Sequence, residues 1–206
     1  MRVLQSCFKR ERGFTLLEVL VSLVILVFGL LGIIGMQAFT QVATFESYQR
    51  GQALILVQDM ADRLATNRGA AGCYAITIDT TTGSPFAGMP ATAAAPTCTA
   101  AVGTAATRAI ADIDLAAWDG ALKGAAEQTG GASVGAVLGA RGCISYTAAT
   151  NSYRIAVAWQ GMAATVAPTA GDPAATCAKG TGTTYGSEPQ RREVSVTVRI
   201  ANLTGI

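Results

Sequence analysis

The hydrophobic pattern begins with one long apolar segment near the amino terminus. Residues 14–36 are almost entirely apolar, and Glu18 is the single side chain among them that can carry a charge. A helix of this length, at about 1.5 Å per residue, spans about 35 Å, whereas the hydrocarbon core of a bilayer is roughly 30 Å thick. Because a helix pairs its own backbone polar groups, the segment predicts a single membrane-spanning helix.

From residue 37 the pattern becomes amphipathic without leaving the helical period. The residues that form the apolar stripe are Ala53, Leu56, Val57, Met60 and Leu64. No proline precedes Pro85, so we expect one helix over 14–68, with an amphipathic half over 37–68. Asn67 and Gly69 predict its end, because both residue types tolerate the left-handed conformation of a helix terminus.

The remaining chain predicts loops, one short helix and a small sheet. Residues 69–110 have the composition of turns and loops, and residues 111–128 predict a helix ended by Gly130 and Gly131. Strands are predicted at 141–147, 153–159 and 193–200, and residues 148–152 form the expected hairpin loop. The apolar faces of these strands hold Tyr153, Ile155, Val157 and Trp159, and Val194, Val196, Val198 and Ile200.

These elements together predict an α+β fold. The apolar stripe of the amphipathic half-helix and the apolar face of a small antiparallel sheet can each bury the other. The pattern divides the chain into a short basic segment over 1–13, here called the leader, an apolar membrane half-helix over 14–36, and a head over 37–206.

Charge is distributed unevenly between the leader and the rest of the chain. The formal net charge of +2 comes from the leader, because its removal leaves 11 basic and 12 acidic side chains. Basic residues beside a membrane segment remain on the cytoplasmic side, which places the head across the membrane. The nearly neutral head gives no indication of nucleic-acid binding.

The residues at the start of the apolar segment form a specific motif. A short basic leader precedes Gly13, Phe14 follows it, and Glu18 lies four positions further on in the apolar run. This arrangement resembles the signal of type IV prepilins and their relatives. The resemblance implies a pilin fold, cleavage between Gly13 and Phe14 by a prepilin peptidase, N-methylation of Phe14, and a role of Glu18 in subunit assembly.

Other segments are similar to the PilV family of minor pilins. They include residues 14–32, residues 61–68, the Asp114-Leu115-x-x-Trp118 segment and the strand at 153–159. This resemblance implies a minor pilin that primes assembly of a type IV pilus within a tip complex. It also implies major and minor pilins as partners. The expected location is the inner membrane, with one membrane pass and an extracytoplasmic head, and then the pilus fibre or tip.

Several alternative interpretations remain open. Glu18 can be an interfacial residue that reaches the lipid headgroups. An ordinary secretory signal has a shorter apolar core than this one. A minor pseudopilin of a type II secretion system shares the same leader, and a tip adhesin would need a binding site in the loops at 69–110 or 161–190. A membrane-anchored enzyme is the least favoured class.

The cysteines predict an oxidised head. Cys7 lies in the leader, which leaves Cys73, Cys98, Cys143 and Cys177, an even number with three possible connectivities. We favour Cys73–Cys98 and Cys143–Cys177, because each pair would close a loop-rich segment. Reduced structural thiols are the alternative.

Catalytic and metal-binding motifs are missing from the sequence. The chain has no histidine, so a Ser-His or Cys-His nucleophile pair is excluded and a zinc site is disfavoured. Asp112, Asp114 and Asp119 lie close together in the sequence and could hold a cation. Because Asp112 and Asp114 are two positions apart, they do not share a helix face, and we interpret the three residues as a solvated helix start. We therefore expect no enzyme activity and no cofactor.

Overall fold

The computed structural model describes most of the chain. The described residues are 13–88, 93–125, 128–133, 135, 137–168, 176–179, 185 and 187–201. The leader residues 1–12 lie outside them. The chain forms two compact units, Met1–Thr44 and Phe45–Ile206, which are described separately.

The first unit contains the apolar part of a long helix, α1, which runs over Leu16–Thr66. All residues from 13 to 44 are exposed, and the helix continues through Gly29, Gly32 and Gly35 without a break. The hydroxyls of Ser22 and Thr40 donate to helix carbonyls, at 2.9 Å to Val19 O and 2.9 Å to Met36 O. The helix thus pairs these polar groups internally.

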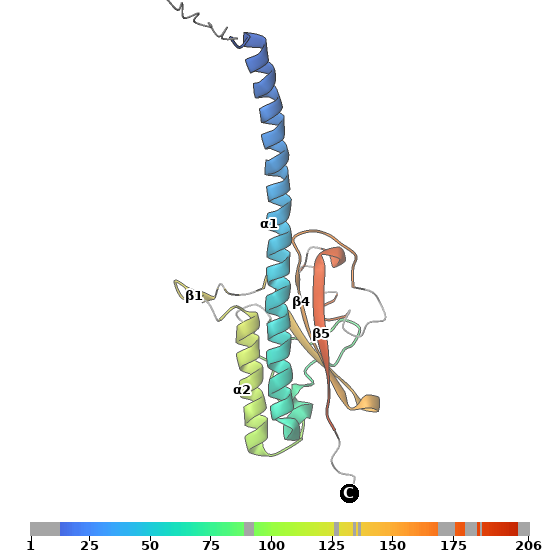
Figure 1. Ribbon diagram of the computed structural model, residues 1–206. Coiled ribbons are helices and arrows are strands. Elements are labelled where there is room, and N and C mark those ends of the chain that lie inside the picture. Colours follow the sequence, from blue (N-terminus) through green and yellow to red (C-terminus); the bar gives the residue numbers. More distant parts are fainter. Residues whose placement is uncertain are drawn as a thin grey trace, which may run out of the picture. The chain divides into compact units, whose positions relative to one another are not determined.

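The second unit is an α+β domain, as the sequence predicts. It combines the remainder of α1 with the second helix, α2 (Ala105–Leu122), and a sheet of three antiparallel strands in the order β3-β4-β5. Figure 1 shows α2 and this sheet beside the lower part of α1. The stripe predicted on α1 is confirmed, since Ala53, Val57, Met60 and Leu64 are buried and Leu56 packs against them.

The sheet follows the predicted alternation. The strands are β3 (Arg141–Thr147), β4 (Ser152–Gln160) and β5 (Arg191–Arg199), and Ile144, Ile155 and Val196 lie in register across them. One face of β4 is buried in the core with α1 and α2, and the valines of β5 pack against that core. The predicted apolar faces of both strands are therefore confirmed.

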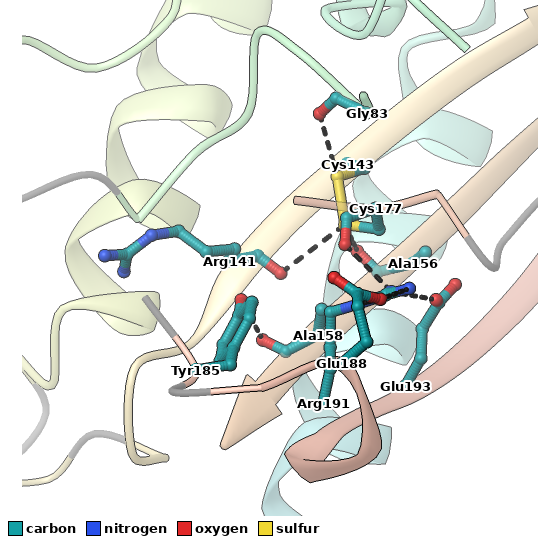
Figure 2. Close-up of polar contacts among 10 residues, drawn as sticks. All are labelled: Gly83, Arg141, Cys143, Ala156, Ala158, Cys177, Tyr185, Glu188, Arg191 and Glu193. Carbon is teal, nitrogen blue, oxygen red and sulfur yellow. Dashed lines mark hydrogen bonds and ion pairs between the residues drawn. A yellow bond between two sulfur atoms is a disulfide. The ribbon is translucent and has the colours of Figure 1, made fainter. Parts of the chain in front are cut away.

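The opposite face of the sheet is also covered, which the sequence analysis did not predict. A second buried cluster contains Phe86, Cys143, Ala156, Ala158, Cys177, Ala178 and Tyr185. Figure 2 shows the buried Arg191 beside this cluster. Its guanidinium donates to Cys177 O at 3.1 Å and forms ion pairs with Glu188 and Glu193 at 2.9 and 3.1 Å. A buried charge needs such partners, and they attach the segment around Cys177 to the start of β5.

The short helix begins earlier than predicted and ends earlier too. The Thr104 hydroxyl accepts from Thr107 N, and the Thr107 hydroxyl accepts from Thr104 N, so this capping box starts α2 at Ala105 instead of residue 111. The helix ends at Leu122, and Gly124 follows with φ of +83°. Gly130 and Gly131 instead form the turn between the two-residue strands β1 (Gln128–Thr129) and β2 (Ala132–Ser133).

The end of α1 also differs from the prediction. Asn67 has φ of −105°, so it does not adopt the left-handed conformation, and α1 ends at Thr66. The Asn67 amide is buried and donates to Tyr74 Oη at 3.1 Å and to Thr107 O at 2.8 Å. A short 3₁₀ helix, η1 (Arg68–Tyr74), follows directly within a segment predicted as loop.

The turns around the sheet are tighter than predicted. Between β3 and β4 lies the 3₁₀ turn η2 (Ala148–Thr150), followed by Asn151 at φ of +46°, so Ser152 belongs to the strand and not to the loop. The 3₁₀ turn η3 (Glu188–Gln190) leads into β5, which begins two residues before the predicted position and ends at Arg199.

Trp118 joins the three layers of the second unit. Its side chain is fully buried, and its indole N–H donates to Leu56 O on α1 at 2.9 Å. On its other side it lies against Gly142 of β3, where a Cβ atom would approach the ring to 2.3 Å. Glycine at position 142 therefore permits the close packing of α2 on the sheet.

We predict that Trp118→Ala lowers the free energy of unfolding by about 3–5 kcal/mol, because it removes a fully buried aromatic side chain and leaves a cavity. Urea unfolding of the full chain in detergent, followed by tyrosine fluorescence or circular dichroism, measures this loss. Ile113→Ala on the same helix is the matched control, since Ile113 is 67% exposed, and its effect should stay within about 0.5 kcal/mol. Equal effects of the two substitutions would contradict the packing role of Trp118.

Candidate assembly site

The expected cleavage junction lies in an open stretch just before α1. Phe14 is 82% exposed, and a Cβ atom added at Gly13 would meet no other atom within 4 Å. The residues that the structure describes, from Gly13 onward, therefore leave space around the Gly13–Phe14 bond. A requirement for glycine at this position would have to come from the peptidase and not from packing in the substrate.

Thr15 defines the first turn of α1. The backbone N–H of Glu18 points to Thr15 O at 3.1 Å and to the Thr15 hydroxyl at 3.3 Å. This is the interaction of an N-cap residue with the third helical position. Glu18 thus lies in the first turn, where the helix dipole favours a negative charge.

The Glu18 side chain lies at the surface of the first helical turn. The residue is exposed, and its side chain makes no hydrogen bond or ion pair with any other residue that the structure describes. It is surrounded by exposed apolar residues such as Leu17 and Val21. The helix start therefore carries a carboxyl group without a partner among the described residues, on an apolar surface close to the residue expected to become the new amino terminus.

The apolar surface of the first unit is extensive. Its large side chains from Phe14 to Phe39 are between 43% and 84% exposed. Within the described ranges, α1 is the helix with the length and composition to cross a membrane, and its most apolar window has a mean hydropathy of 2.9. Exposed apolar surface of this extent requires either lipid or another protein surface.

The four cysteines of the head form two disulfides in the second unit. Cys73 is bonded to Cys98, and Cys143 is bonded to Cys177. These are the two pairs that the sequence analysis favoured. The first disulfide connects η1 to the segment that precedes α2. The second attaches the segment around Cys177, which covers the outer face of the sheet, to β3 (Figure 2).

The interpretation of Asp112, Asp114 and Asp119 as a solvated helix start is wrong. Asp112 accepts from Cys98 N at 2.6 Å, and the buried Asp119 accepts from Gly88 N at 2.7 Å. Asp119 also pairs with Lys123 at 2.6 Å. The carboxylates hold loop backbone against α2, a role that the spacing of the three residues does not reveal.

Asp114 connects α2 to the end of α1. Its carboxylate accepts from Tyr74 Oη at 2.5 Å and pairs with Arg63 at 3.0 Å, while Arg63 also pairs with Asp59 at 2.9 Å. Burial, together with the hydrogen bond to Asp114, raises the pKa of Tyr74. The hydrogen bond to Asp59 raises the pKa of Arg63, although burial opposes it. These groups therefore connect the two helices through hydrogen bonds and ion pairs.

One pocket lies on the outer face of the sheet. It has a volume of about 70 Å³ and is lined by hydroxyl side chains, Arg154 and the Cys143–Cys177 disulfide. Pockets that enclose small ligands usually measure roughly 300–1,000 Å³. Among the described residues, no group of three His, Cys, Asp or Glu side chains is arranged to hold a metal ion.

Two charged residues of the second unit were missed in the sequence analysis. Arg191 was not considered, although acidic residues at positions 188 and 193 flank it in the sequence. Glu46 was not considered either, although it is the first charged residue after Glu18. Its carboxylate accepts from the backbone of Met162 and pairs with Arg192 at 3.4 Å.

Comparison with known protein families finds a match at the start of α1. The family model described as "Prokaryotic N-terminal methylation motif" matches residues 8–34, which include Gly13, Phe14 and Glu18. No curated protein and no solved structure matches the chain. The motif match, the exposed apolar helix and the α+β head together support a type IV pilin-like protein with a prepilin-type signal.

Proposed function

We propose that this chain is a minor pilin of a type IV pilus and primes pilus assembly as part of a minor-pilin tip complex. The observation that carries the proposal is the methylation motif at residues 8–34, which coincides with an exposed helix start and with Glu18, whose side chain has no partner in the described part of the chain. The finer assignment to a minor pilin is supported by the sequence resemblance to the PilV family. Its partners would be the major pilin and other minor pilins.

Processing is the first step in this proposal. The basic leader would hold residues 1–13 on the cytoplasmic side of the inner membrane, where a prepilin peptidase would cut after Gly13. Hydrolysis of that peptide bond gives Phe14 a free amine, which is then methylated. The exposed junction and the absence of close neighbours around Gly13 are compatible with access by such an enzyme.

Assembly is the second step, and Glu18 is its central residue. In the membrane-anchored subunit the Glu18 carboxylate lies near one end of an apolar helix. In a fibre the same carboxylate would meet the positively charged amine of Phe14 on a neighbouring subunit. Removing one member of a buried ion pair typically costs about 3–5 kcal/mol, so this pairing would favour one axial register between subunits.

A minor pseudopilin of a type II secretion system is the second candidate. The observation that favours it is the same motif at residues 8–34, which pseudopilins share. Deleting the gene separates the two functions, because loss of a minor pilin lowers the number of surface pili whereas loss of a pseudopilin lowers protein secretion. A tip adhesin is the remaining candidate, and parts of the loops at 69–110 and 161–190 that would carry its binding site lie outside the described residues.

The first prediction of this proposal concerns the mature amino terminus. Mass spectrometry of the protein from its native membrane should find a chain that begins at methylated Phe14, because the motif directs cleavage after Gly13. Gly13→Ala is expected to be processed and a bulky substitution such as Gly13→Leu to remain uncleaved. A native protein that retains residues 1–13, or one cut beyond residue 36, would exclude prepilin-type processing.

The second prediction concerns incorporation into fibres. Glu18→Ala should leave cleavage and head folding intact but abolish recovery of the protein in sheared pili, because the amine of the neighbouring Phe14 then lacks its partner. Immunoblots of the membrane and sheared fractions measure this distribution. The deletion strain complemented with the variant should remain poorly piliated.

Ser22→Ala is the matched control for Glu18→Ala. Ser22 is the next polar residue of the same segment, and its hydroxyl is already paired with Val19 O, so its loss should not change incorporation. Wild-type amounts of the Glu18→Ala protein in sheared fibres, together with full piliation, would show that the carboxylate is merely interfacial.

A further inference from the structure

One edge of the three-stranded sheet is open along β5. The strand order β3-β4-β5 leaves β3 and β5 at the two edges, and Figure 1 shows β5, in red, beside β4. Another segment of the chain covers the edge of β3, because Thr77 N donates to Ile144 O at 2.9 Å and Ala87 pairs with Gly142. Among the described residues, no segment pairs in this way with the outer edge of β5 over residues 194–199.

The backbone of β5 turns alternate residues toward this open edge. Two hydrogen bonds beyond its ends define the alternation, since Ile200 N donates to Asn151 O at 3.1 Å and Gly161 N donates to Gln190 O at 2.7 Å. In the antiparallel register of β4 and β5, the even-numbered residues of β5 therefore bond to β4. From position 194 onward, the odd-numbered residues turn their backbone N–H and C=O groups to the open edge, where no described residue pairs with them. They are Ser195, Thr197 and Arg199, and all three are exposed.

The open edge lacks the features that protect most edge strands. Residues 194–198 have the sequence Val-Ser-Val-Thr-Val, with no proline, glycine or charged side chain. Natural proteins place charges, proline or bulges on such edges, because the unpaired backbone groups otherwise bind another strand. The valines of this segment are only partly buried on the inner face of the sheet, so an added strand would cover them further. The edge of β5 therefore favours pairing with an extended strand.

A second copy of β5 is complementary to this edge in the antiparallel orientation. In a register centred on Thr197, this threonine lies opposite Thr197 of the other copy, and Ser195 lies opposite Arg199 of the other copy. On the inner face, the apolar residues at even positions from 194 to 200 lie opposite one another. Paired threonines and paired β-branched residues stabilise neighbouring strands, whereas like charges that face each other do not. This register keeps the two Arg199 side chains apart, and a register centred on Arg199 would bring them together.

We propose that the open edge of β5 binds β5 of a second copy of this chain, so that the three-stranded sheets of the two heads join into one continuous sheet. Ser195, Thr197 and Arg199 each exchange two backbone hydrogen bonds with the residue opposite, which gives about six bonds across the contact. The same surface serves on both copies, so the contact has two-fold symmetry and closes after two copies. The proposal concerns the head alone and adds a self-association site to it.

The test maps the contact with single cysteines in the full chain, purified in detergent in a Cys7→Ser background that retains both disulfides. Thr197→Cys should give a covalent dimer with a short thiol crosslinker, because the two Thr197 positions face each other. Thr147→Cys is the matched control, since Thr147 is an exposed threonine on β3, the opposite edge strand of the same sheet. We expect about tenfold less dimer from the control, because β3 is not the open edge. Equal amounts of dimer from the two variants would overturn the proposal.

A mixed sample tests the register. Ser195→Cys and Arg199→Cys chains should crosslink when they are combined and not when either is alone, because these two positions lie opposite each other only between copies. Crosslinking of each variant with itself, and none in the mixture, would contradict the register centred on Thr197.

Charge substitutions at Thr197 separate this contact from association through α1. When both cysteine chains also carry Thr197→Lys, the mixed crosslink should be lost, because two like charges then face each other. One chain with Thr197→Lys and the other with Thr197→Glu should restore it, which a misfolded variant could not do. An unchanged crosslink in the Lys–Lys mixture, or no recovery in the Lys–Glu mixture, would overturn the contact. In cells that assemble pili, a Thr197→Cys crosslink to a different protein and none to a second copy would overturn the choice of partner.

Discussion

The structure depends on how the apolar surface of one helix is removed from water. Over residues 45–66, α1 buries a stripe beneath α2 and the sheet, and the second unit folds around this stripe. Over residues 16–44 the same helix is exposed along its whole length in the described part of the chain, although its side chains are among the most apolar in the sequence. The first half therefore requires a partner outside the subunit, and lipid and neighbouring helices are the two environments that suit it.

Within the head, three carboxylates of α2 connect this helix to the surrounding loops and to α1. Asp112, Asp114 and Asp119 bind backbone amides, Tyr74 or cationic side chains of the second unit. Trp118 packs α2 against both α1 and the sheet, because its indole lies between Leu56 and Gly142. The two disulfides attach the loop segments to this framework. The head is thus held together by contacts within the second unit.

The sequence predicted the elements whose signal is periodic. The stripe on α1 and the alternation on β4 and β5 depend on local spacing, and both were correct. The start of α2 was missed because a Thr-Thr capping box, and not the hydrophobic pattern, determines it. The partners of Asp114 and Glu46 lie far away in the chain, so no spacing rule could have found them. The two acidic partners of Arg191, at 188 and 193, are its neighbours in the sequence, but their pairing with a buried guanidinium depends on the cover over the sheet. The motif at the start of α1 could be recognised from the sequence, because all of its residues lie within one short segment, 8–34.

The central claim is that the exposed half of α1 exchanges lipid for other subunits when the protein enters a fibre. A photo-crosslinking amino acid at Leu23, which is 60% exposed, tests this claim directly in cells that assemble pili. The account predicts lipid adducts in the membrane fraction and adducts with other pilin-like subunits in sheared fibres. A protein that is present in fibres and still yields only lipid adducts, or no adducts, at this position would contradict it.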